Sequence, residues 1–152
     1  MNLYAYAGNN PIRYRDPFGL DSVKVVSDAL QRVVEAKRDK DVVFDSVYAA
    51  LDRDPRTFRL IGTDVVPGHP LNSPAARFTG KTFARDDEWA GFEEYLGFTD
   101  EKDVGVAVIG MNGPHPGEST GHEMGHLLQI KDGKSFSHDD AIMLRIIQHF
   151  GY

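Results

Sequence analysis

The chain has 152 residues, of which 41% are hydrophobic and 26% charged, and its formal net charge is −6. This length and composition predict a globular domain that buries a core without disulfides, and the chain contains no cysteine. The acidic balance argues against a nucleic-acid partner, because nucleic-acid binders normally present a basic surface. No apolar run approaches the roughly 18 residues that span a bilayer, so we expect no membrane insertion by this segment.

Residues 1–20 differ in character from the rest of the chain. Two turn-forming clusters, Asn9-Asn10-Pro11 and Asp16-Pro17-Phe18-Gly19-Leu20, are interleaved with aromatic residues. The run Asn-Leu-Tyr-Ala-Tyr-Ala-Gly-Asn-Asn-Pro-Ile at positions 2–12, followed by Asp-Pro-Phe-Gly-Leu, resembles the end of the core of Rhs-family (YD-repeat) polymorphic toxins. In that family a large β-cage ends in an Asp-Pro-x-Gly-Leu motif, and a variable toxin domain is released by cleavage just after the Leu.

This resemblance implies a division of the chain between Leu20 and Asp21, which would be the processing site. Residues 1–20 would be the end of the Rhs core, and residues 21–152 would be the toxin domain. The resemblance also implies a secreted or delivered effector that acts in the cytosol of a target cell. Its expected partners are the Rhs cage of the parent chain and a cognate immunity protein.

Hydrophobic spacing predicts two helices and a strand in the first part of the body. Apolar residues at helical spacing predict an amphipathic helix over residues 22–40 and a second helix over residues 41–51, which Asp54-Pro55 would end. Residues 57–61 are rich in β-prone side chains and are closed by Gly62, so we expect a strand there.

The middle of the chain contains a long loop and the most apolar strand. Proline and glycine recur over residues 64–81, which predicts a loop that can end in a strand at residues 76–83. Residues 86–96 have helical spacing. The β-branched run at residues 104–109 predicts a strand, and a Gly- and Pro-rich loop follows it.

The most informative motif is Gly121-His122-Glu123-Met124-Gly125-His126-Leu127-Leu128. Two histidines four residues apart share one face of a helix, where both imidazoles can bind one zinc ion and Glu123 can act as a general base. A competing interpretation is a capping box at Thr120 and Glu123, in which Glu123 only closes the start of the helix. The apolar neighbours of the histidines favour the metal interpretation, because imidazoles beside an apolar face need partners.

A strand, a short loop and a His-Glu-x-x-His helix resemble the order of elements in zincin metallopeptidases. This resemblance implies an α+β fold in which a small mixed sheet packs on the motif helix and a C-terminal helix follows. It also implies that the strand beside the motif helix, here residues 104–109, pairs with an extended substrate.

A catalytic zinc needs a third protein ligand, and four residues are candidates. Ser137 to Asp140 fits a capping box that opens a final helix running to about Phe150. Asp139 falls near the centre of the buried face of that helix, and we choose it as the third ligand. Asp132, His138 and Asp140 remain alternatives. Asp132 would project away from the metal if the motif helix continues to Gly133, a typical residue just after a helix end.

The sequence therefore predicts a zinc metalloendopeptidase toxin with one Zn²⁺ per chain, held by His122, His126 and Asp139. A zinc-bound water would attack a peptide bond of a target-cell protein, with Glu123 as its general base. The alternatives are a metal-dependent nuclease or other hydrolase, and a non-catalytic domain with an accidental motif. Several residues could stabilise the oxyanion: His115, His138, Arg145, His149 and Tyr152.

Overall fold

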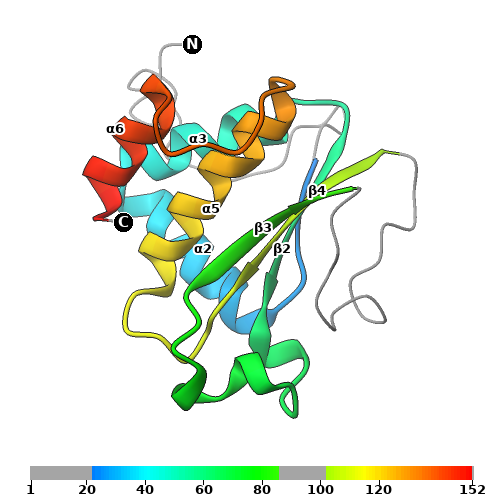
Figure 1. The fold of residues 1–152 in the computed structure, drawn as a ribbon, viewed down its shortest axis with the longest axis vertical. Helices are drawn as coiled ribbons and strands as arrows, with labels where there is room; N and C mark the ends of the chain where they lie inside the picture. Colours follow the sequence, from blue (N-terminus) through cyan, green and yellow to red (C-terminus); the bar gives the residue numbers. More distant parts are fainter. Residues whose placement is uncertain (1–21, 86–101, 152) are drawn as a thin grey trace.

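The computed structural model describes residues 22–85 and 102–151, and within them the fold is α+β. Four α-helices lie on one side of a four-stranded mixed sheet, as Figure 1 shows. The described residues confirm the predicted α+β class and the small mixed sheet.

Two predictions from the sequence fall on parts of the chain that the structure does not describe. The processing site was predicted between Leu20 and Asp21, and both Leu20 and Asp21 lie outside the described residues, which begin at Ser22. The helix predicted at residues 86–96 also lies outside them. The division of the chain after Leu20 and the role of Asp21 as the first residue of a released domain therefore stay predictions.

The sheet has the strand order β1-β2-β4-β3. Strands β1 (Val23–Val25), β2 (Thr57–Gly62) and β4 (Asp103–Ile109) run parallel, and β3 (Gly80–Ala84) runs antiparallel to β4. Strand β4 is thus hydrogen-bonded on both sides and cannot pair with a substrate, so the prediction for residues 104–109 is wrong on that point. Among the described strands, β3 lies at the edge of the sheet beside β4, and its Thr82 side chain contacts Glu123 of the motif helix.

The first predicted helix begins later than expected. Val23–Val25 form β1 because they pair with β2, and Val26 continues that contact by donating its N–H to the carbonyl of Leu60. Helix α2 (Asp28–Lys40) then starts after Ser27, whose hydroxyl oxygen accepts the N–H of Leu30. Helix α3 (Val42–Asp52) confirms the second predicted helix and is capped by Asp41.

Helix α5 (Pro116–Lys131) contains the His-Glu-x-x-His motif and begins earlier than the predicted cap. Pro116 occupies the first turn, where its missing N–H costs nothing, and the Thr120 hydroxyl donates to the carbonyl of Pro116. Glu123 therefore lies two turns into the helix, which excludes the capping-box interpretation. The helix ends as predicted: Gly133 has a φ of 69°, and the N–H groups of Gly133 and Lys134 bond back to the last turn.

Helix α6 (Ala141–Phe150) also begins later than predicted, because Asp140 rather than Ser137 is its N-cap. Its buried side chains are Met143, Ile146 and Phe150. Together with residues of α2, α3, α5 and one face of the sheet they form the main hydrophobic core. The 3₁₀-containing segment at residues 63–76 contributes Val65, Val66 and Leu71 to a smaller apolar cluster, whose buried members come from β2, β3 and β4. No helix of the described residues is long and apolar enough to cross a membrane.

Glycines on α5 allow α6 to approach its backbone closely. A Cβ at Gly121 would lie 2.5 Å from two ring carbons of Phe150, and a Cβ at Gly125 would lie 2.5 Å from the sulfur of Met143. Both contacts are far shorter than van der Waals separation. Close helix packing thus explains glycine in the middle of a helix, where it is otherwise unfavourable.

We predict that Gly121→Ala destabilises the protein, although alanine is the better helix former. The overpacked Phe150 ring should lower the free energy of unfolding by about 1–2 kcal/mol, measured by urea denaturation. Gly117→Ala is the matched control in the same helix, because its Cβ meets only the flexible Lys37 side chain. Equal stability of the two variants would contradict the packing argument.

Candidate metal centre

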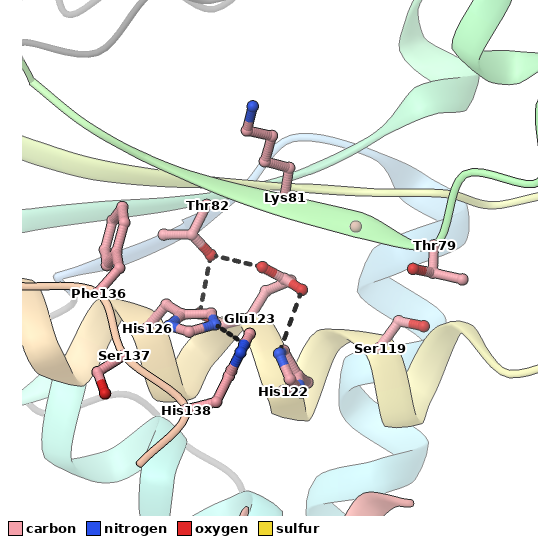
Figure 2. A pocket seen from close by; sticks show the side chains of 11 residues that line it. Thr79, Lys81, Thr82, Ser119, His122, Glu123, His126, Phe136, Ser137 and His138 are labelled. Carbon is pink, nitrogen blue, oxygen red and sulfur yellow. Dashed lines mark hydrogen bonds and ion pairs between the residues drawn. The ribbon is translucent and has the colours of Figure 1, made fainter. Parts of the chain in front are cut away.

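Three histidine side chains converge beneath β3, as Figure 2 shows. His122 and His126 lie one turn apart on α5, and His138 comes from the segment between α5 and α6. One ring nitrogen from each histidine lies within 4.8 Å of the other two, and His126 Nε2 is 3.1 Å from His138 Nε2. Nitrogens bound tetrahedrally to zinc at about 2.1 Å are separated by roughly 3.4 Å. This three-histidine cluster could therefore hold a metal ion after small adjustments.

The turn at the end of α5 explains how His138 reaches the cluster. Gly133 reverses the chain in its left-handed conformation, and residues 134–140 run back beside α5 before α6 begins (Figure 1). The sequence predicted that the final helix opens at Ser137, which would have placed His138 in its first turn. Because the helix starts three residues after His138, the side chain comes from a non-helical segment and points back towards His126.

The structure does not bring the first-choice third ligand to the histidines. Asp139 is exposed, and its backbone N–H donates to the Ser137 hydroxyl. Asp132 is exposed at the end of α5, where its carboxylate pairs with Lys131. Asp140 caps α6 and accepts a hydrogen bond from the Gln129 amide. Of the four candidates, His138 alone joins His122 and His126 in one group.

Glu123 is the buried acid of the site, with 8% of its surface exposed. The Thr82 hydroxyl on β3 donates to Glu123 Oε1 at 2.9 Å and also lies 3.1 Å from the Glu123 carbonyl oxygen. Glu123 Oε2 is 4.0 Å from His122 Nε2. Burial raises the pKa of Glu123 to about 7, and the Thr82 hydrogen bond opposes that rise. A carboxyl group with a pKa near 7 can both accept and release a proton at neutral pH.

Burial favours the neutral form of His126, the second histidine of the motif. Burial is the main cause that lowers the pKa of His126, and the neighbouring His138 adds to the effect. A hydrogen bond between His126 Nδ1 and Gln129 Oε1, 2.7 Å long, acts in the opposite direction. Neutral imidazole is the ligand form, so burial favours metal binding near neutral pH.

A cavity of about 470 Å³ opens between β3 and α5, directly over the cluster. Strand β3 forms one wall, α5 forms the other, and residues 136–138 close one end (Figure 2). Its lining combines the three histidines and Glu123 with seven further residues, most of them polar: Thr79, Gly80, Lys81, Thr82, Ser119, Phe136 and Ser137. A cavity of this size accommodates several residues of a peptide or a small molecule.

Of the five candidate oxyanion donors, the structure places only His138 in the cavity lining among those it describes. His138 lines the cavity, but it belongs to the histidine cluster. His149 bonds to Asp41 at 2.9 Å, and neither it, His115 nor Arg145 lines the cavity. Tyr152 lies outside the described residues. Sequence reasoning missed Thr82 and Gln129, because a lone threonine in a strand and a glutamine in a helix carry no local signal of their own.

Comparisons of the chain with protein-family models, with curated proteins and with solved structures give no match. The class of the site therefore follows from its own chemistry: a possible metal centre of three histidines with a buried carboxyl group beside it.

We predict that His138→Ala weakens metal binding while Asp139→Ala leaves it unchanged. Losing one of three nitrogen ligands should raise the metal Kd by more than the 10- to 100-fold that indirect changes typically cost. Chelator competition with Zn²⁺ and Co²⁺ measures both values, and the adjacent Asp139 variant is the matched control. Loss of metal from the Asp139 variant alone would favour the acidic ligand chosen from the sequence.

We also predict that, relative to Glu123→Gln, the metal-free wild-type protein loses stability as the pH rises from about 4.5 to about 7. The folded state holds the Glu123 proton more tightly than the unfolded state, so raising the pH through this window favours unfolding. The shift corresponds to a loss of about 3 kcal/mol. Denaturation in the presence of a chelator should show this fall in the wild type and a flatter profile in Glu123→Gln. Parallel pH profiles for the two proteins would contradict it.

Proposed function

We propose that this chain is a zinc-dependent endopeptidase whose metal ligands are His122, His126 and His138. The observation that carries the proposal is a buried carboxyl group, Glu123, one residue from the first ligand and facing the same cavity as all three histidines. Three neutral imidazoles suit zinc better than hard cations, which prefer oxygen ligands. Three protein ligands also leave a fourth position for water or substrate, as catalytic zinc sites require.

In the proposed reaction, Glu123 carries out the proton transfers. A bound zinc ion would acidify a water molecule and polarise the substrate carbonyl. Glu123 accepts the proton of the attacking water and delivers it to the leaving nitrogen of the cleaved peptide bond. The Thr82 hydroxyl holds Oε1 of Glu123, so that the other carboxyl oxygen faces His122.

We propose an extended peptide as the substrate that the cavity accepts. The Thr79 to Thr82 segment runs along one wall, above Glu123, and its backbone can hydrogen-bond an extended chain. Gly80 lets β3 lie close to the Glu123 side chain, because a Cβ at this position would lie 2.9 Å from Glu123 Cγ. Together with the order of strand, loop and motif helix, these features support a zincin-like peptidase.

The proposal for biological context rests on residues 1–20 and their resemblance to Rhs cores. We propose that residues 21–152 act as the toxin domain of such a protein, released by cleavage between Leu20 and Asp21 and delivered to the cytosol of a target cell. The substrate would be a protein of that cell. A cognate immunity protein would protect the producer.

We predict that Glu123→Ala keeps one zinc per chain and loses peptide hydrolysis. Removing a general base typically slows the chemical step by 10²- to 10⁴-fold. Cleavage of casein and of peptide libraries measures the rate, and metal analysis measures the zinc. Glu118→Ala, on the same helix but outside the cavity lining, is the control.

The same variants test the toxin proposal in cells. Expression of the chain in a bacterial cytosol should stop growth, and Glu123→Ala should restore it. Undiminished killing by that variant would contradict the mechanism. Degradation of DNA or RNA that depends on Glu123 would instead identify a metal-dependent nuclease.

A further inference from the structure

Gln129 is a buried side chain, 3% exposed, one turn after His126 on α5. Its amide group contacts three parts of the site. Oε1 lies 2.7 Å from His126 Nδ1, while Nε2 donates to the Ser137 carbonyl at 2.8 Å and to the Asp140 carboxylate. Gln129 thus joins a histidine of the motif helix to the segment that carries His138.

The hydrogen-bond partners fix which way the amide points. A backbone carbonyl and a carboxylate only accept hydrogen bonds, so both must face the NH₂ group of Gln129. Oε1 then faces His126 and also accepts the N–H of Ser137 at 3.4 Å. His126 must therefore carry its proton on Nδ1, which leaves the lone pair on Nε2. That Nε2 atom is the one 3.1 Å from His138 Nε2.

We propose that Gln129 is the positioning residue of the metal centre: it holds His126 in the Nδ1–H tautomer and fixes the segment that presents His138. This inference rests on the proposed metal function. It gives a role in that function to a residue that is not itself a metal ligand. The network continues beyond Gln129, because Asp140 Oδ1 accepts the N–H of Met143 at 2.8 Å and so caps α6. One amide thereby ties the orientation of a ligand ring to the start of the next helix.

The first test replaces Gln129 with leucine, which has a similar size and no hydrogen-bonding group. Loss of a hydrogen bond behind a ligand typically costs 10- to 100-fold in metal affinity, and we expect a Kd increase in that range for Zn²⁺. The absorption spectrum of bound Co²⁺ should change as well, because the ligand geometry relaxes. Gln148→Leu, an exposed glutamine on α6, is the control and should bind metal like the wild type.

The second test exchanges donor and acceptor along the network. Gln129→Glu still accepts from His126 Nδ1–H, but its second oxygen faces the Asp140 carboxylate without a donor between them. Metal affinity should fall. Adding Asp140→Asn returns an N–H donor to that contact and keeps an N-cap oxygen, so the double variant should recover part of the affinity. The Ser137 carbonyl still faces an oxygen in the double variant, so recovery should be incomplete. A side chain that only fills space would show no such rescue.

Nitrogen NMR of the metal-free protein supplies a readout that needs neither zinc nor substrate. The wild type and the double variant should carry the His126 proton on Nδ1, and Gln129→Leu should lose that preference. Wild-type affinity together with an unchanged tautomer in Gln129→Leu would overturn the proposal, and so would an Nε2 proton in the wild type. If Gln129→Leu fails to fold, the glutamate variant and its rescue decide the question.

The outcomes separate this inference from the proposed function. A wild-type protein that binds no zinc would contradict the proposed peptidase function. The tautomer measurements would still show whether Gln129 determines the tautomer of His126. A protein that binds zinc without cleaving peptides would leave both the affinity and the tautomer tests in force. Normal zinc binding and peptide cleavage in Gln129→Leu, with its tautomer retained, would remove only the role of Gln129.

Discussion

The close packing of α6 against α5 is the constraint on which the rest of the site depends. Gly121 and Gly125 leave no side chain in the contact, so Phe150 and Met143 rest almost on the helix backbone. This packing leaves Glu123, about half a turn away from Gly121, facing β3 and the cavity. It also brings the start of α6 near the end of α5, within reach of the Gln129 amide. Helix α5, which carries two of the histidines, is thus fixed by its packing against α6 and by the hydrogen bond from Gln129 to Asp140.

Burial then gives the site its chemical character. A carboxyl group and an imidazole in water would both be charged between about pH 4.5 and pH 6.5. Here burial favours the neutral forms of both groups, so it raises the pKa of Glu123 and lowers the pKa of His126. A neutral imidazole is ready to bind a cation, and a metal ion would in turn favour the ionised carboxylate. The protein therefore stores unfavourable burial energy that a bound ion could offset.

Local signals in the sequence predicted elements more reliably than their ends. The strands at residues 57–61 and 104–109 and the helix at residues 41–51 are confirmed, because their apolar patterns match the faces that the core buries. Val23–Val25 became a strand because a neighbouring strand was available to pair with it. Helix α5 starts at Pro116 and not after the cap expected at Thr120, because proline is favoured in the first turn. Helix α6 starts at Ala141 because Asp140, and not Ser137, caps it.

The sequence by itself determined the chemistry that is local to one helix. The four-residue spacing of His122 and His126 placed both rings on one face, and Gly133 marked where the helix ends, since helix geometry depends only on neighbours along the chain. Only the tertiary structure decided the rest of the site. Thr82 reaches Glu123 across 41 positions of the chain, and His138 reaches His126 through a reversal whose path depends on where α6 starts. Contacts of that kind depend on how the elements pack, and no spacing within one segment encodes them.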